Sequence, residues 1–250
     1  MGLLVHLKVI ACEVAAREIF YCAARARNTV EIELFTQGLH DNADACRAEL
    51  QKRIDTASPS QFQAVLLGYG LCNNAIVGIR AGQVKMAIPR AHDCITLFLG
   101  SAERYAEEFA GHPGTYYYTS GWLEYQQRGG QRVEYAQKSG LAKRMAYEEL
   151  VRKYGAENAE YIRQVMDGWQ VKYTRGALVR FPFTDHLRLD ASVREICAKN
   201  NWQYAELDGD PKLLQDLLDG NWQDEKFLVL EPGEKVKAEY SNRIICAETA

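Results

Sequence analysis

Residues 64–72 read AVLLGYGLC and residues 85–94 read KMAIPRAHDC. In each segment, an apolar run typical of a buried β-strand passes directly into residues with thiol, imidazole or carboxylate side chains. Two more such runs occur upstream, VHLKVIAC at residues 5–12 and TVEIELF at residues 29–35. Segments of helical character separate the four runs, and strands that alternate with helices form parallel sheets. The sequence therefore predicts an α/β fold.

The alternation of strand and helix extends over most of the chain and predicts a mainly parallel sheet with helices on both faces. The expected parts are N-terminal βα units over residues 1–112, which carry the candidate site, a helical insert over 138–168 and C-terminal βα units over 176–235. They form either a single α/β domain over residues 1–250 or two Rossmann-like lobes around a cleft.

Local signals predict several details of the elements. A helix is expected over residues 73–81, directly after the glycine turn of GYGLC, and Asp41 and Asp93 are expected to cap two other helices. The aromatic segment PGTYYYTSGW, residues 113–122, is expected to form an extended strand followed by a loop.

The composition is that of an ordinary globular protein, with 47% apolar residues, 25% charged residues and a formal net charge of −3. No dense run of lysine or arginine occurs, so we expect no nucleic-acid partner. The N-terminal segment lacks the basic start of a signal peptide, and no apolar run approaches the roughly 18 residues of a membrane span. The seven cysteines form no C-x-x-C pair and are expected to be reduced thiols. We therefore expect a cytoplasmic protein that acts on a small molecule, away from membranes.

Soft, ionisable side chains follow three of the expected strands. Cys12, Cys72 and the segment His92–Cys94 lie where strands should end. Parallel strands end at one edge of a sheet, and open α/β sheets bind ligands along that edge. Zinc accepts thiolate and imidazole ligands, and iron shares much of this preference. The sequence predicts a zinc or iron site with Cys72, His92 and Cys94 as ligands and Cys12 as the next candidate.

A second interpretation needs no metal. Cys72 is then a nucleophile at a strand–helix turn, His92 is its general base, and Asp93 or Glu13 orients the imidazole. Such a protein would be a hydrolase or an acyl or amidino transferase. A third interpretation is a carrier whose closed site delivers a metal or a corrinoid to a partner.

The remaining candidates would bind substrate or have only structural roles. Arg90 is placed to hold a carboxylate or phosphate of a cofactor. Tyr69, Tyr116, Tyr117 and Trp122 are candidates to wall a pocket for a flat or methylated ligand, although aromatic runs more often form core. His40 lies in a polar loop, where an exposed histidine without a role is the simpler interpretation. The cysteines expected to be structural or without a role are Cys22, Cys46, Cys197 and Cys246.

Several motifs together resemble a known family. In order they are LGYGLCNNAIVGI (67–79), IPRAHDCITLFLGSAERY (88–105), PGTYYYTSGW (113–122), LDGDPKLLQDLLDGNW (207–222) and FLVLEPG (227–233). The chain resembles the bacterial and archaeal family known as domain of unknown function 1638 over most of its length. The positions that match the family pattern are Cys12, Glu13, Tyr69, Gly70, Cys72, Arg90, His92, Asp93, Cys94, Gly114 and Trp122. Asn73 stands where other members often have glycine.

The resemblance implies a role in one-carbon or methylated-amine metabolism, because such genes often lie near corrinoid-dependent methyltransferase systems. A corrinoid protein or a methyltransferase would then be the partner. The chain would not bind a corrinoid itself but would have access to the corrinoid that the partner carries. The H-x-C motif with a distant cysteine is also similar to the zinc site of enzymes that methylate thiol cofactors, although here the lone cysteine comes first. On this basis we expect a metal-binding protein of methyl transfer.

Overall fold

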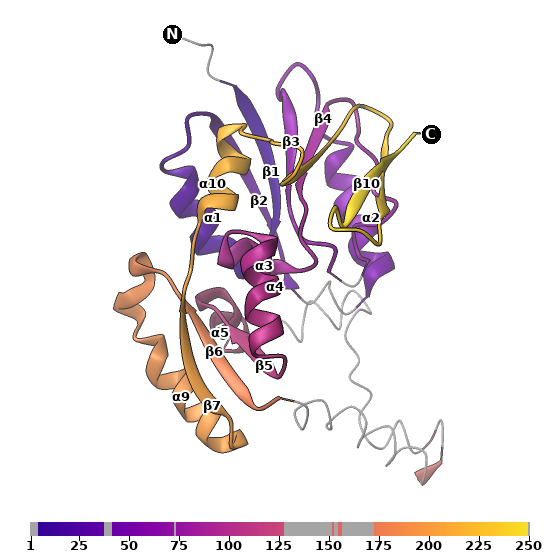
Figure 1. The fold of residues 1–250 in the computed structure, drawn as a ribbon. Coiled ribbons are helices and arrows are strands. Elements are labelled where there is room, and N and C mark those ends of the chain that lie inside the picture. Colours follow the sequence, from indigo (N-terminus) through magenta and orange to yellow (C-terminus); the bar gives the residue numbers. More distant parts are fainter. Residues whose placement is uncertain are drawn as a thin grey trace.

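The computed structural model describes residues 5–37, 42–72, 74–127 and 173–249, together with residues 152, 155 and 156. Its larger sheet has five strands in the order β2-β1-β3-β4-β8 (Figure 1). The four strands that precede residue 90 run parallel, and the last strand runs antiparallel to its neighbour. The strands are β1 (His6–Cys12), β2 (Thr29–Phe35), β3 (Ala64–Gly68), β4 (Lys85–Pro89) and β8 (Phe227–Leu230). The predicted α/β fold with a mainly parallel sheet is confirmed.

Helices cover both faces of this sheet, which explains why its central strands are apolar throughout. α1 (Ala16–Ala23) packs against α10 (Lys212–Asp219), and α10 also contacts β3 and β4. α2 (Ala43–Ile54) packs against β1 on the other side of the sheet (Figure 1). This placement follows from right-handed crossovers, because the chain moves outward from β1 to β2 and then back past β1 to β3.

A second, smaller sheet contains the strands β5 (Thr115–Tyr118), β6 (Arg175–Arg180) and β7 (Gln203–Asp208). All three run parallel, and α9 (Leu189–Asn200) packs against β6 and β7. The buried residues Tyr118, Leu178, Val193, Cys197 and Trp202 form its own core. The parallel strands thus fall into two sheets, which occupy the upper and lower parts of Figure 1.

Two short helices connect β4 with β5, and a backbone contact joins the sheets a second time. α3 (Cys94–Leu99) and α4 (Ala102–Gly111) pack together between the strands. α5 (Ser120–Gln127), after β5, packs against the 3₁₀ helix η1 (Glu13–Ala15) that follows β1. A Cβ atom on Gly121 would lie 2.0 Å from the carbonyl oxygen of Val14, so only glycine permits this approach.

The C-terminal segment packs beside β8, the strand at one edge of the larger sheet, through β10 (Ile245–Glu248). β9 (Lys235–Ala238) and β10 form an antiparallel pair. The buried guanidinium of Arg90 donates to the carbonyl oxygens of Asp224, Arg243 and Ile245 and forms an ion pair of 3.0 Å with the Asp224 carboxylate. One buried cation therefore ties the end of β4 to the C-terminal hairpin.

Several predicted details prove different. Residues 74–78 form turns in place of the expected helix, with i to i+3 hydrogen bonds from Val77 to Asn74 and from Ile79 to Ile76. Gly78 adopts φ 85°, a left-handed conformation that a helix cannot contain.

Three other expectations concern caps and the segment after β5. The side chain of Asn42 caps α2, where Asp41 was expected. Asp93 caps α3, as predicted. The residues after β5 form α5 and not a loop, because Thr119 and the small residues that follow it allow the chain to turn directly into a helix. The predicted insert over 138–168 lies outside the described residues, apart from residues 152, 155 and 156. Within the described part of the chain, no helix has the length and apolar character that a membrane crossing requires.

Candidate functional site

The loops after β3 and β4 run side by side and bring two of the predicted cysteines to the same end of the sheet. The Leu71 N–H donates to the Ala91 carbonyl at 2.7 Å, and the Cys72 N–H donates to the His92 carbonyl at 2.9 Å. A Cβ atom on Gly70 would lie 2.7 to 2.8 Å from the backbone atoms of Asp93. The glycine of the GYGLC motif is therefore required for the contact between the loops.

The thiols that follow β1, β3 and β4 lie close enough to influence one another electrostatically. Burial, and then the Asp93 carboxylate, raise the pKa of Cys72 to about 12. The pKa of Cys94 lies well above its ordinary value because of burial and then because of Cys72, Asp93 and Cys12. Burial is also the main cause of the raised pKa of Cys12. The thiols at this sheet edge are consequently protonated at neutral pH.

One further thiol belongs to this neighbourhood. Cys46, on α2, contributes to the raised pKa of both Cys12 and Cys72. Its sequence position in an amphipathic helix indicated a structural role only, because the spacing of apolar residues cannot tell which strand end a helical residue faces.

The described residues do not form a metal-binding group. No three of their His, Cys, Asp and Glu side chains are placed to hold an ion. His92 is exposed while Cys12 is buried, so these two predicted ligands face different environments. Glu13 accepts a hydrogen bond of 2.9 Å from the Gln37 N–H. Ligation of zinc or iron by Cys72, His92, Cys94 and Cys12 stays a prediction.

Asp93 and Cys94 also border a cavity of about 320 Å³ between the two sheets. Half of its lining residues are aromatic, and most of these come from α4, β5 and α5, the elements that follow α3 in the chain. The lining residues with aromatic or polar side chains are Asp93, Cys94, Phe98, Tyr105, Phe109, Thr115, Tyr116, Tyr117, Thr119, Trp122 and Tyr173. We call this cavity the aromatic pocket.

The aromatic rings of the pocket meet at steep angles. Tyr105 and Tyr117 have ring centroids 5.8 Å apart and ring planes at 81°. Tyr116 and Tyr173 lie 5.2 Å apart at 88°. Trp122 meets Tyr116 at 6.3 Å and 47°. Such edge-to-face pairs enclose space from several directions instead of forming one flat stack.

Both carboxylate oxygens of Asp93 accept hydrogen bonds at the border of the pocket. One carboxylate oxygen accepts the Ile95 N–H at 3.0 Å and caps α3, and the other accepts the Tyr105 hydroxyl at 3.0 Å. Burial is the main cause of the raised pKa of this carboxyl group, and the two hydrogen bonds oppose it. The carboxylate is therefore held in one orientation at the border of an apolar space.

The structure separates the expected ligand-binding residues into two groups. Tyr116, Tyr117 and Trp122 line the aromatic pocket, as a pocket wall requires. Tyr69 is 1% exposed and does not line it. Arg90 contacts the C-terminal segment through its guanidinium group, so binding of a cofactor by Arg90 or Tyr69 stays a prediction.

The sequence did not indicate four aromatic residues of the wall, which are Phe98, Tyr105, Phe109 and Tyr173. Tyr105 and Phe109 are four positions apart on α4, and their rings pack edge to face at 6.4 Å. An i, i+4 aromatic pair on an otherwise charged helix is the signal that would have indicated them. His40 lies outside the described residues.

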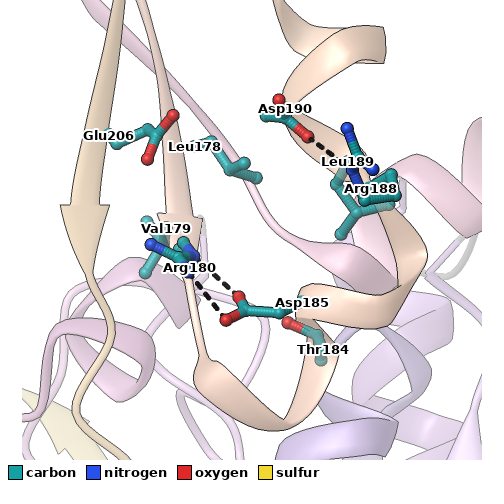
Figure 2. Close-up of a pocket in the computed structure, with 9 residues that line it drawn as sticks. All are labelled: Leu178, Val179, Arg180, Thr184, Asp185, Arg188, Leu189, Asp190 and Glu206. Atoms are coloured by element: carbon teal, nitrogen blue, oxygen red, sulfur yellow. Dashed lines mark hydrogen bonds and ion pairs between the residues drawn. The ribbon is translucent and has the colours of Figure 1, made fainter.

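A second cavity of about 320 Å³ lies beside the carboxyl end of β6 in the smaller sheet. Figure 2 shows Arg180 paired with Asp185, whose two carboxylate oxygens accept hydrogen bonds of 2.7 Å each from the Arg180 guanidinium. Glu206 has no partner among the residues drawn and forms an ion pair of 3.4 Å with Arg194. Arg188 lies 4.0 Å from Asp190 in the same view. Because these exposed charges already have partners, this cavity gives weaker support for a ligand than the aromatic pocket does.

Comparison with known protein families identifies a match to a family of unknown function. The family model described as "Protein of unknown function (DUF1638)" matches residues 34–218. That range contains β3, β4, the aromatic segment and both loops of the site, whereas Cys12 precedes it. No curated protein matches the chain.

Proposed function

We propose that this chain, which belongs to the family of proteins of unknown function DUF1638, binds a small organic substrate in the aromatic pocket. Asp93 and Cys94 would be the polar groups that position it. The observation that carries the proposal is the place of these two residues, at the carboxyl end of β4 and at the border of an aromatic cavity.

The shape and lining of the pocket support this role. Binding sites for small molecules are concave and largely apolar, with a few polar groups that fix the orientation of the ligand. In open α/β sheets they lie beyond the carboxyl ends of parallel strands. The aromatic pocket meets both conditions, and its volume of about 320 Å³ suits a compact molecule.

The chemistry of the thiols favours substrate binding over attack by a resting nucleophile. A nucleophilic cysteine needs a lowered pKa, yet burial and the neighbouring Asp93 raise the pKa of Cys72 to about 12. In the interpretation without a metal, Cys72 attacks the substrate as a thiolate. That thiolate would need a positively charged group of the substrate beside it to lower the pKa of Cys72.

We place this binding protein in one-carbon metabolism, in line with the context that the family resemblance implies. A corrinoid protein or a methyltransferase is the proposed partner. The support from the site itself is that the thiol of Cys94 lines the pocket and those of Cys72 and Cys12 lie close enough to raise its pKa. Soft, polarisable sulfur suits methyl-transfer chemistry.

Ligand-observed NMR with a set of neutral, anionic and cationic fragments would test the binding site. We expect fragments to bind the wild-type protein and the Cys246→Leu variant, and to lose binding in Cys94→Leu, where the larger side chain enters the pocket. Cys246 lies in β10, outside the pocket lining, and provides a matched control. Binding that is unchanged in a folded Cys94→Leu protein, or no binding at all, would contradict the proposal.

A further inference from the structure

We infer that the ligand of the aromatic pocket is an organic cation of the alkylated ammonium class, held by aromatic ring faces and by the Asp93 carboxylate. This inference rests on the proposed binding function and adds the chemical class of the ligand. It draws on the charge of the pocket, the arrangement of its rings and one hydroxyl group.

The charge of the lining favours a cation. Among the described residues that line the pocket, Asp93 carries the one carboxylate, and none is a lysine, an arginine or a histidine. The guanidinium of Arg175 is near Tyr117, but it forms an ion pair of 3.2 Å with Glu108. An anionic ligand would meet Asp93 without a compensating charge, whereas a cation would supply the charge that this partly buried carboxylate lacks.

The rings favour a rounded cation over a flat one. Aromatic faces attract cations within about 6 Å of the ring centroid, and cages of several rings are the usual site for quaternary ammonium groups. Here two pairs of rings are nearly perpendicular, at 81° and 88°. A flat ligand would need parallel faces, so this geometry suits a compact, alkylated head group.

Tyr117 adds a polar contact to this apolar cage. Its hydroxyl oxygen is buried and has no hydrogen-bond partner among the described residues. A buried polar group without a partner is costly, and the residue lines the pocket. A rotation of the Tyr117 ring on binding would let a hydroxyl group beside the ammonium head of the ligand form a hydrogen bond with this oxygen.

The test compares two probes of the same shape and different charge. Choline carries a quaternary nitrogen, and 3,3-dimethyl-1-butanol has a neutral carbon in its place. Binding of each to the purified protein would be measured by isothermal titration calorimetry and ligand-observed NMR. We expect choline to bind at least about tenfold more tightly than its neutral counterpart, because several ring faces and one carboxylate act on the charge.

A variant then assigns the charge effect to Asp93. Asparagine caps helices as well as aspartate does, so Asp93→Asn should keep α3 intact while the negative charge is lost. We expect choline binding to weaken about tenfold and binding of the neutral alcohol to stay unchanged. Asp44→Asn, which removes an exposed carboxylate on α2, is the matched control and should change neither.

The outcomes separate the two proposals. Equal binding of both probes to the wild-type protein would overturn the inference about charge and leave the binding site standing, and this comparison needs no variant to fold. Fragment binding that prefers anions would also overturn the inference. If the wild-type protein bound neither probe and none of the fragments, the proposed binding function itself would be contradicted.

Discussion

The Gly70→Ala substitution would test whether the contact between the loops after β3 and β4 holds the site together. The added Cβ atom would lie 2.7 Å from the Cα atom of Asp93 and 2.8 Å from its backbone nitrogen and carbonyl carbon. Ordinary van der Waals contact begins near 3.4 Å, so the two backbones must separate by about 0.7 Å. All three contacts are with backbone atoms, which cannot rotate away.

The expected cost follows from two effects. Overpacking of a buried site typically costs about 1–3 kcal/mol. The same separation would stretch the hydrogen bonds from Leu71 to Ala91 and from Cys72 to His92, now 2.7 and 2.9 Å, each of which contributes about 1 kcal/mol. Together they predict a loss of about 3–5 kcal/mol in the free energy of unfolding if both hydrogen bonds break.

Urea denaturation followed by circular dichroism would measure this loss. Gly111→Ala is the matched control, since Gly111 is the last residue of α4 and a Cβ atom there would have no neighbour within 4 Å. We expect the control to be neutral or stabilising by up to about 1 kcal/mol. If Gly70→Ala unfolded within 0.5 kcal/mol of the wild-type protein, the close approach of the two loops would be refuted.

Three further predictions concern a buried carboxyl, a buried guanidinium and the thiols. Burial raises the pKa of Glu18 from 4.5 to about 7. The folded state therefore binds this proton more tightly than the unfolded chain, and the stabilisation is complete below pH 4.5 and lost as the pH rises to 7. We expect a loss of about 3 kcal/mol over this window, measured by urea denaturation at several pH values, and a flatter profile in Glu18→Gln. Arg90→Ala should lower the free energy of unfolding, measured by urea denaturation, by about 3 kcal/mol or more, because it leaves buried carbonyl groups without donors. Arg188→Ala, which removes an exposed side chain, should lower it by less than 0.5 kcal/mol. Similar losses for both variants would contradict the structural role of Arg90. Elemental analysis of protein purified without a metal-affinity tag should find about one equivalent of zinc or iron that is lost in Cys72→Ser and kept in Cys246→Ser if the predicted metal site exists; metal-free wild-type protein would count against it.

The sequence was sufficient for the fold class because buried parallel strands leave a direct signal. The apolar runs at residues 64–67 and 84–88 lie within one residue of β3 and β4. The division of the strands into two sheets could not be assigned in the same way, since each parallel strand has the same apolar pattern whichever neighbour it pairs with. The helix expected after Cys72 failed for a local reason, the left-handed conformation of Gly78.

For the site, sequence position predicted which residues follow a strand, and this was enough to bring Cys72 and Cys94 together. It could not predict exposure, which separates His92 from Cys12. It also could not assign Tyr105 to the wall of the same cavity, because that contact depends on how α4 packs between the two sheets.

The two sheets contribute different properties to the pocket. The larger sheet supplies the groups that can change charge, Asp93 and the thiols, and they are fixed by backbone contacts between loops. The smaller sheet and its helices supply most of the aromatic wall, and α5 is seated on η1 at Gly121. Substitutions in β5 should therefore change which ligand binds while leaving the thiol environment intact. Substitutions after the strand ends of the larger sheet should change both, because Asp93 and Cys94 also line the pocket. The difference follows from the fold, because the loops that carry Asp93 and the thiols extend from the larger sheet, whereas β5 and α5 belong to the part of the chain that builds the smaller sheet.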